Sequence, residues 1–230
     1  MSGEKVTFGC KGVEKKYGKK QVLCGVDFTA QKGKIIGLFG TNGSGKTTLF
    51  RILSGLEGEF TGELFKNDFE DIAYMSVDNI HSPEMRVKDL VEFYGFFLKK
   101  QRTDWIYTQL ALAKIGKNSL LSALSTGMRQ YVKFLLTIHS GASVCLFDEP
   151  LLGLDVNYRG YVVETLIQEL NENRSFLIAT HEIKEFETLI DGFYILQGGK
   201  LSEYYDLESL VEETGKSAGE FYKEKVNGHV

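Results

Sequence analysis

Short runs of apolar residues alternate along this chain with segments in which apolar residues recur at helical spacing. Four continuous apolar runs, each short enough to be a buried strand, occupy residues 35–39, 144–147, 176–179 and 193–196. Leu49, Ile52 and Leu53 mark an amphipathic helix after the first run, and a longer one covers residues 162–170. This alternation predicts an α/β fold with a mostly parallel sheet and helices on both faces.

Three other stretches show different patterns. Residues 1–39 have the composition of strands and turns, which predicts an N-terminal antiparallel β portion. Residues of about 80–140 carry apolar positions at helical spacing and predict an α-helical subdomain inserted into the α/β core. Residues of about 203–230 are polar with scattered apolar positions, so we expect a short helical or frayed tail. We expect a single domain over residues 1–230.

The most specific motif follows the first buried run. Residues 40–47 read GTNGSGKT and fit the phosphate-loop pattern GxxxxGK[ST] at every fixed position. Glycines let the backbone wrap around a polyphosphate, and the start of the following helix adds a positive dipole end. Lys46 can reach the β- and γ-phosphates, and Thr47 can offer its hydroxyl to Mg²⁺. We therefore expect a nucleoside triphosphate to be bound by Gly40, Thr41, Asn42, Gly43, Ser44, Gly45, Lys46, Thr47 and Thr48.

The run at residues 144–147 ends in two carboxylates. Asp148 comes at the end of the expected strand, where it can hold Mg²⁺ directly or through water. Glu149 is the next residue and is expected to point the other way, where it can polarise the water that attacks the γ-phosphate. Two solvated carboxylates are the alternative, but a phosphate loop in the same chain favours the metal and catalytic roles.

Composition narrows the class of protein. Hydrophobic residues make up 43% and charged residues 25% of the 230 residues, which is typical of soluble globular proteins. The formal net charge is -4 and there is no long basic run, so we expect no nucleic acid as the main partner. Three cysteines without metal-binding spacing fit a reducing compartment, and no apolar run is long enough to span a bilayer.

The order of the remaining motifs indicates a family. Leu124-Ser125-Thr126-Gly127 precedes the carboxylate pair, Gly153-Leu154-Asp155 follows it, and His181 comes later. From Tyr17 to about residue 201 the chain resembles the ATPase domain of ABC transporters. The resemblance implies a P-loop NTPase core, ATP and Mg²⁺ as cofactors, and a separate transmembrane permease subunit. It also implies a second ABC ATPase protomer, as a homodimer or a heterodimer.

The resemblance also implies roles for single residues. Tyr17 matches the aromatic residue that stacks on adenine, and His181 matches the histidine that contacts the γ-phosphate and helps to orient the attacking water. Ser125 is a good helix N-cap, and with Gly127 it forms a second anion site. In the family that site closes over the nucleotide of the other protomer, and Asp155 matches the loop that links the two sites. The expected catalytic residues are Lys46, Glu149 and His181.

The chain departs from the family pattern at three places. Val77 stands where a glutamine usually contacts Mg²⁺ or the attacking water, and valine has no donor or acceptor. We expect Asp78, which we place among the metal residues, or Asn79 to replace it. Thr126 stands where a glycine is usual and can slow closure by stiffening the turn. Apolar residues at 151–152 suggest a drier dimer seam. None of these changes removes the hydrolytic residues, so we expect a working ATPase.

The expected function is the ATP-hydrolysing subunit of an ABC transporter, located in the cytoplasm on the inner face of the cell membrane through its permease. Residues 128–130 resemble the corresponding residues of exporter ATPases that serve drug export, antimicrobial-peptide export or peptide immunity. The resemblance therefore implies export. A soluble ABC ATPase without a transport role, or an ATP-binding regulator with little turnover, is the alternative.

Segments of the permease should dock near residues 77–100. Four aromatic residues gather there, and we expect most of them to form the core of the insertion and the remainder to be docking surface: Phe93, Tyr94, Phe96 and Phe97.

Overall fold

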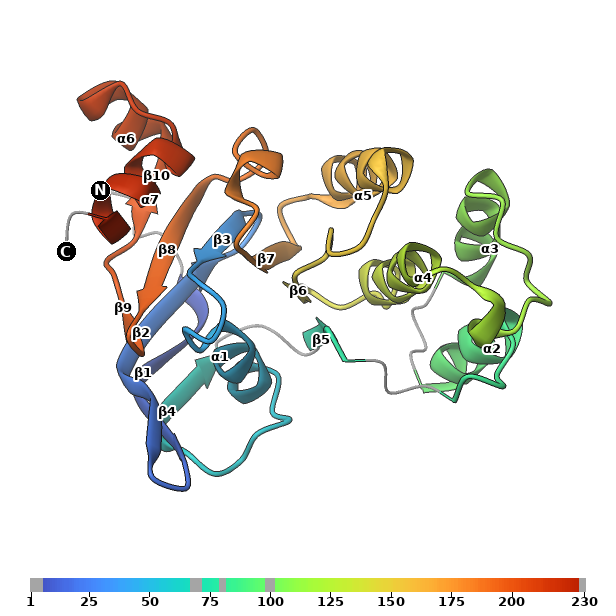
Figure 1. The fold of residues 1–230 in the computed structure, drawn as a ribbon, viewed down its shortest axis with the longest axis horizontal. Coiled ribbons are helices and arrows are strands. Elements are labelled where there is room, and N and C mark those ends of the chain that lie inside the picture. The colour runs from blue at the N-terminus through green and yellow to red at the C-terminus, as the bar shows by residue number, and fades with distance from the viewer. Residues whose placement is uncertain (1–5, 67–71, 79–81, 98–101, 228–230) are drawn as a thin grey trace.

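In the computed structural model of the protein, a mostly parallel sheet forms the centre of the molecule (Figure 1). The structure describes residues 6–66, 72–78, 82–97 and 102–227. Neighbouring strands follow the order β10-β8-β3-β7-β6-β5, in which β8, β3, β7, β6 and β5 run parallel. The parallel strands are β3 Ile35–Phe39, β5 Ile72–Met75, β6 Val144–Asp148, β7 Ser175–Thr180 and β8 Gly192–Gln197. Two short strands, β9 (Lys200–Leu201) and β10 (Tyr205–Asp206), pair antiparallel with β8.

A second, antiparallel sheet is built from the N-terminal part of the chain. It comprises β1 (Val6–Tyr17), β2 (Lys20–Gln31) and β4 (Thr61–Lys66), in the order β2-β1-β4. Helix α1 (Lys46–Leu53) packs its buried side chains into the core that this sheet shares with one face of the central sheet. The predicted N-terminal antiparallel portion is confirmed.

Alternate residues of the central strands face two different cores. Ile36 and Leu38 of β3 belong to the core shared with the antiparallel sheet and α1, whereas Ile35 and Phe39 belong to the core on the other face. Both faces are therefore covered, which explains why the strands appear in the sequence as continuous apolar runs and not as alternating patterns.

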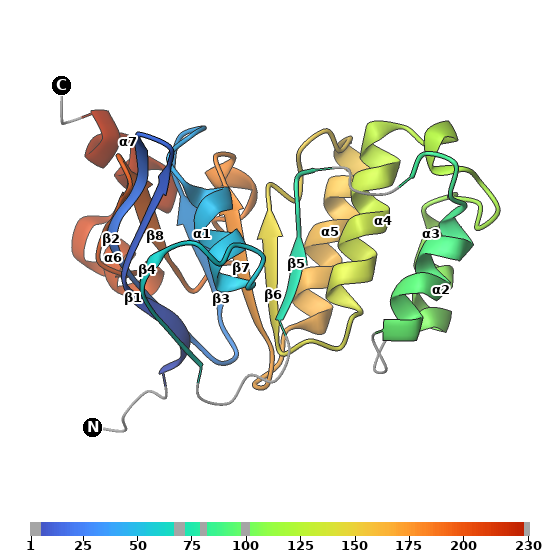
Figure 2. The same cartoon turned by 90° about the horizontal axis from the view of Figure 1, so that it is seen from below.

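Helices between β5 and β6 form the predicted insertion. These are α2 (Val87–Phe97), α3 (Thr103–Leu112), the short η1 (Leu121–Ala123) and α4 (Thr126–Ile138). Helix α4 packs against α5 (Val156–Glu169), and α2 and α3 lie beyond them at the far end of the molecule (Figure 2). The predicted α/β class with an inserted helical subdomain is confirmed.

The expectation that the aromatic residues of α2 form the core of the insertion is wrong for two of them. Phe93 is 52% exposed and Phe96 81% exposed, while Tyr94 packs against the core. Val87, Leu90 and Val91 supply the buried stripe of α2, and Tyr94 continues it at helical spacing. Positions 93 and 96 fall outside that stripe, and the side chain of Phe97 lies outside the described residues.

Over the residues that the structure describes, the C-terminal segment is helical, which is one of the two alternatives expected for it, and is not frayed. After β7 come the short η2 (Ile183–Glu185) and β8, and the segment itself continues with α6 (Leu207–Thr214) and α7 (Ala218–Asn227). The ring centroids of Phe221 and Tyr205 lie 4.8 Å apart, and both rings pack near Phe193 of β8. These aromatic contacts dock the end of the chain onto the sheet. Within the described ranges, no helix has the length and apolar character needed to cross a bilayer.

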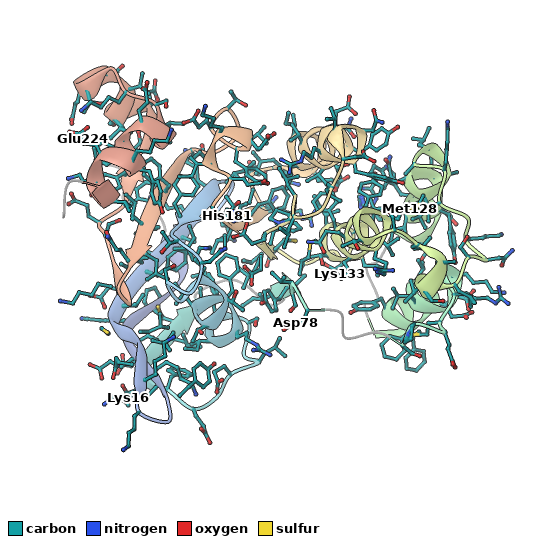
Figure 3. All side chains as sticks on the ribbon, in the orientation of Figure 1. Lys16, Asp78, Met128, Lys133, His181 and Glu224 are labelled. Carbon is teal, nitrogen blue, oxygen red and sulfur yellow. The ribbon has the colours of Figure 1, made fainter. Side chains whose placement is uncertain are left out.

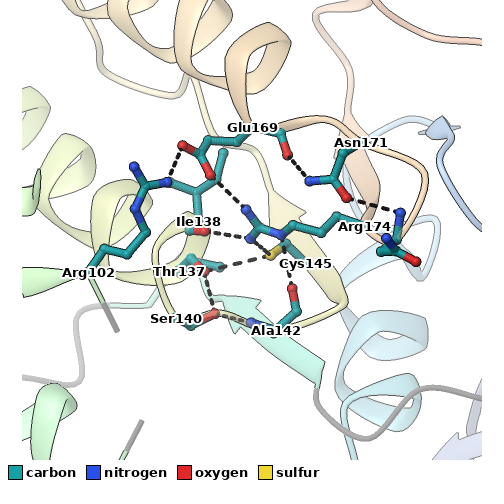
Figure 4. A network of polar contacts seen from close by, with 10 residues as sticks. Arg102, Thr137, Ile138, Ser140, Ala142, Cys145, Glu169, Asn171 and Arg174 are labelled. Carbon is teal, nitrogen blue, oxygen red and sulfur yellow. Dashed lines mark hydrogen bonds and ion pairs between the residues drawn. The ribbon is translucent and has the colours of Figure 1, made fainter. Parts of the chain in front are cut away.

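Arg174, just before β7, joins the ends of several elements (Figure 4). Its guanidinium donates to the carbonyl oxygens of Ile138 and Ala142, at 2.5 and 3.1 Å, and pairs with Glu169 at 3.1 Å. Glu169 also pairs with Arg102 at 2.7 Å, but the Arg102 side chain is 50% exposed whereas that of Arg174 is 14% exposed. Arg174 therefore satisfies buried carbonyl groups that Arg102 does not reach.

We predict that Arg174→Leu lowers the free energy of unfolding by about 3 kcal/mol, because it leaves two carbonyls and part of a buried ion pair without a donor. Arg102→Leu is the matched control, since it removes the exposed arginine from the same carboxylate and should cost less than about 1 kcal/mol. Urea unfolding followed by circular dichroism measures both. Equal costs for the two variants would contradict the assigned role of Arg174.

Candidate active site

The phosphate loop joins the end of β3 to the start of α1 and relies on glycine at several positions. Gly43 and Gly45 have φ angles of 78° and 114°, in the left-handed region that favours glycine. A Cβ atom on Gly45 would lie 2.9 Å from the Leu23 side chain, and one on Gly40 would lie 2.5 Å from the Leu196 carbonyl oxygen. The loop is thus pressed against β2 and β8, which fixes its path.

Lys46, at the start of α1, is buried and directed back into the loop. Its Nζ donates to the carbonyl oxygen of Gly40 at 2.7 Å and lies 3.5 Å from Oε1 of Glu149. The Lys46 side chain is 6% exposed, so its ammonium group is largely shielded from water and would pair strongly with a phosphate.

Asp148 ends β6 beside the loop and is fully buried. Its Oδ2 accepts hydrogen bonds from Thr47 Oγ1 at 2.7 Å and from the Tyr74 hydroxyl at 3.2 Å. Burial raises the pKa of Asp148, while these two hydrogen bonds act to lower it. Its Oδ1 has no hydrogen-bond partner among the described residues. A buried carboxylate oxygen without a donor, next to a threonine hydroxyl, fits the oxygen ligands that Mg²⁺ prefers.

Glu149 has a left-handed backbone, with φ 49°, which is uncommon for a residue other than glycine. The backbone is held on both sides: its N–H donates to Ala179 at 2.8 Å, and its carbonyl accepts from Gln130 Nε2 at 3.1 Å. The Glu149 carboxylate contacts residues at the end of β7. Oε1 lies 2.9 Å from His181 Nδ1, and Oε2 accepts from Thr180 Oγ1 at 3.0 Å. The two consecutive carboxylates therefore have different hydrogen-bond partners, and their predicted roles toward Mg²⁺ and the attacking water stay predictions.

A pocket of about 520 Å³ opens over these groups. It brings together residues that the sequence predicted separately, from the N-terminal sheet, the phosphate loop and the ends of β6 and β7: Tyr17, Lys46, Thr47, Asp148, Glu149 and His181. His181 is labelled in Figure 3 at the end of β7, above the loop region. The pocket is large enough for the phosphates and part of a nucleotide.

Tyr17 stands at the open side of this pocket and is 45% exposed. Its hydroxyl donates to Glu57 at 2.9 Å, and the Lys15 amine lies 4.8 Å from the ring centroid. Lys15 also pairs with Glu57 and, with the backbone of Glu59 and the Tyr17 hydroxyl, lowers the pKa of that carboxyl to about 2. The ring is held from one side, and stacking on adenine stays a prediction.

Ser125, Gly127 and Asp155 do not line the pocket. Ser125 caps α4 by accepting from the Met128 N–H at 3.1 Å, and Asp155 caps α5 by accepting from two backbone N–H groups. A Cβ atom on Gly127 would lie 2.9 Å from the Gly153 carbonyl oxygen, so the two motifs pack together. Ser125 and Asp155 are exposed. Their predicted roles at a nucleotide stay predictions.

Val77 and Asp78 line the pocket, and Asn79 lies outside the described residues. Asp78 is exposed, and its metal role stays a prediction. Sequence reasoning missed Tyr74, Gln130 and Lys133, all of which hold parts of the site. Lys133 had a signal: it is a charged residue inside the apolar stretch that follows Ser125.

Comparison with known proteins gives a consistent result. Residues 23–152 match the sequence model of the family described as ABC transporter. An uncharacterized ABC transporter ATP-binding protein of Methanocaldococcus jannaschii is 30% identical over 206 residues, which cover 87% of this chain and 78% of that protein. The L-cystine import ATP-binding protein TcyC of Bacillus subtilis is 29% identical over 216 residues, covering 84% of this chain and 87% of its own.

Solved structures show the same fold. A structure described as the ATP binding subunit of an ABC transporter superposes with a TM-score of 0.81 at 22% identity, covering 95% of this chain and 98% of that one. A nucleotide-free ATP-binding cassette from an ABC transporter gives a TM-score of 0.75 at 18% identity, with coverage of 91% and 94%.

We predict that Asp148→Asn stabilises the protein in buffer without nucleotide and Mg²⁺. The folded pKa of Asp148 lies above its ordinary value of 3.8, so the ionised carboxyl costs folding free energy at neutral pH. That cost begins to shrink as the pH falls to the folded pKa, and it is gone below the ordinary value of 3.8. Asp148→Asn should therefore raise Tm near neutral pH, and the gain in Tm should shrink toward acidic pH.

Thermal unfolding over a series of pH values measures this effect. Asp191→Asn is the control, because Asp191 pairs with Lys34 and accepts from the Ile35 N–H, both at 2.8 Å, so losing its charge should lower Tm. A fall in Tm for Asp148→Asn at neutral pH would show that the carboxylate is not a net cost.

Proposed function

Since this chain belongs to the ABC transporter family as one of its ATP-hydrolysing proteins, we propose that it powers transport through a separate membrane-spanning permease. The observation that carries the proposal is the placement of Glu149 between Lys46 and His181, at 3.5 and 2.9 Å, in a pocket that also holds the phosphate loop. These groups cover charge stabilisation, proton acceptance and orientation, which hydrolysis of a γ-phosphate needs.

Each residue has a distinct part in the proposed reaction. The Lys46 ammonium exchanges its carbonyl and carboxylate partners for phosphate oxygens and stabilises their charge. The Glu149 carboxylate accepts the proton of the attacking water, and His181 holds the carboxylate in place. Thr47 and Asp148 would hold Mg²⁺, which when bound neutralises part of the phosphate charge.

A second protomer would complete each site. Ser125 caps α4 at an exposed helix N-terminus, which attracts anions, but it lies outside the pocket of its own chain. Two copies arranged about a twofold axis would place the Ser125 end of each against the nucleotide of the other. ATP would then act as the bridge that favours the closed pair.

The proposed permease contact lies at a groove of about 290 Å³ between α2 and α4. Leu90, Leu121 and Val132 supply apolar lining, and Arg129 and Lys133 supply charge. The exposed Phe93 and Phe96 rings belong to the same helix α2. A partner segment with apolar and acidic side chains fits this groove. Of its lining residues, Pro83 and Leu90 lie within residues 77–100, where the sequence predicts docking, and the others lie at positions 121–133.

Export is the direction that residues 128–130 predict, and it stays a prediction, since TcyC is named for import. In the structure, Arg129 donates to the Leu124 carbonyl at 2.6 Å and Gln130 to that of Glu149 at 3.1 Å. These residues therefore have local structural partners, whatever the direction of transport.

We predict that Glu149→Gln lowers kcat for ATP hydrolysis by about 10²–10³-fold, because the amide cannot accept the proton. ATP binding should persist, so the variant should accumulate as an ATP-bound dimer. Size-exclusion chromatography with light scattering in MgATP, alongside a phosphate-release assay, measures both. Wild-type protein without turnover would favour the regulatory alternative, and monomers only in ATP would count against the paired arrangement.

We also predict that two inactive variants restore activity when mixed. Glu149→Gln damages one half of each site, and Ser125→Arg damages the half expected from the partner. In a mixed dimer, one site combines both intact halves, so an equal mixture should recover up to about a quarter of wild-type activity. Mixing either variant with more of itself is the control. No recovery beyond the sum of the two would contradict a site shared between protomers.

A further inference from the structure

Lys133 is a lysine in the middle of α4 that is only 9% exposed. Its neighbours in the helix, Val132 and Phe134, are buried apolar residues. An ammonium group in such a place is costly unless hydrogen bonds replace its water. Burial lowers the pKa of Lys133, and the nearby Asp78 and Asp148 carboxylates act in the opposite direction.

Three consecutive backbone carbonyls satisfy this amine. Lys133 Nζ donates to Ser76 at 2.8 Å, to Val77 at 3.2 Å and to Asp78 at 3.3 Å. An ammonium group has three donors, so this arrangement accounts for all of them. Figure 3 shows the Lys133 and Asp78 labels close together, where the chain leaves β5 and passes α4.

The same backbone segment forms a wall of the nucleotide pocket. Val77 and Asp78 line the pocket together with Lys46 and Asp148. The Val77 side chain has no polar atom with which to fix its own position. The hydrogen bonds from Lys133 of α4 therefore hold the backbone of this wall in position.

Helix α4 holds a second part of the site in the same way. Gln130, three residues before Lys133 and on the same side of the helix, donates to the Glu149 carbonyl at 3.1 Å. One helix thus fixes two backbone segments that border the reacting groups. Lys133 also lines the groove between α2 and α4, so a molecule bound there would contact the side chain that holds residues 76–78.

We propose that Lys133 is a positioning residue for ATP hydrolysis: it ties the backbone of residues 76–78 to α4, so that the pocket wall moves with that helix. The inference rests on the proposed function, because it assigns Lys133 a part in the turnover of ATP. Lys133 is directed at backbone carbonyls and has no part in binding the phosphates, which lie at the glycine loop. Losing it should therefore reduce kcat and leave the affinity for ATP largely unchanged.

The test compares Lys133→Met with wild-type protein in steady-state ATP hydrolysis. Methionine keeps the apolar stem and removes all three donors. We expect kcat to fall at least about tenfold, while KM for MgATP and the binding stoichiometry of a fluorescent ATP analogue change less than about twofold. Lys117→Met is the matched control, because Lys117 is an exposed lysine of the same helical region and should leave both constants unchanged.

Rescue by arginine separates positioning from packing. Arginine supplies donors and similar reach, and the adjoining groove gives its larger head room, so Lys133→Arg should recover kcat to within about threefold of wild type. If Lys133→Met does not fold, Lys133→Gln, which keeps a shorter neutral donor, takes its place with the same comparison of kcat and KM.

The kcat and the ATP affinity of the variants together distinguish positioning from packing and from nucleotide binding. A kcat for the folded neutral variant within about twofold of wild type would show that Lys133 only fills space. A loss of ATP binding in parallel with kcat would show that Lys133 acts on nucleotide binding, and would overturn its assignment to turnover. Wild-type protein without hydrolysis would overturn the proposed function itself and Lys133's part in it. Activity in wild type with no effect of the variant overturns this inference alone.

Discussion

The carboxyl ends of three neighbouring parallel strands, β3, β7 and β6, meet at one edge of the sheet, and the charged groups of the site start there. The phosphate loop with Lys46 follows β3, Asp148 and Glu149 end β6, and His181 follows β7. Parallel pairing is what makes residues about a hundred positions apart into neighbours, as in the 2.7 Å hydrogen bond from Thr47 to Asp148. Without it the same motifs would lie on separate surfaces.

The charged groups at this edge of the sheet destabilise the fold, and the two apolar cores on either face of the sheet offset that cost. Asp148 is fully buried, and one of its oxygens has no hydrogen-bond partner in the part of the chain that the structure describes. Lys46 is 6% exposed, and Glu149 has a left-handed backbone. Each of these features costs free energy in isolation. The strands that hold them are covered on both faces by apolar side chains, so the surrounding packing can keep the site in place.

The sequence predicted the parts of the site that depend on local patterns. The phosphate loop, Asp148 at a strand end and the cap at Ser125 need only a strand, a glycine turn and a helix start, and all three are present. The hydrogen bonds of Lys133 to residues 76–78 join segments more than fifty positions apart, and spacing carries no information on such pairs. The left-handed backbone of Glu149 could not be predicted from local sequence either, because its hydrogen bonds come from Gln130 and Ala179, which are distant in the sequence. The helical spacing of Val87, Leu90, Val91 and Tyr94 defines the buried side of α2, and the same spacing leaves Phe93 on the exposed side.

Helix α4 is where these observations converge. Its first residues follow the exposed Ser125, for which we propose contact with a second protomer, and its middle holds Glu149 through Gln130 and the pocket wall through Lys133. Its side chains Arg129, Val132 and Lys133 also line the groove proposed for the permease. A helix moves as a rigid element, so a displacement of α4 at one of these contacts also displaces its other contacts. The Val77 side chain has no polar atom, but the hydrogen bond from Lys133 reaches the backbone carbonyl of this position. The link between α4 and the pocket wall therefore does not depend on the side chain at position 77.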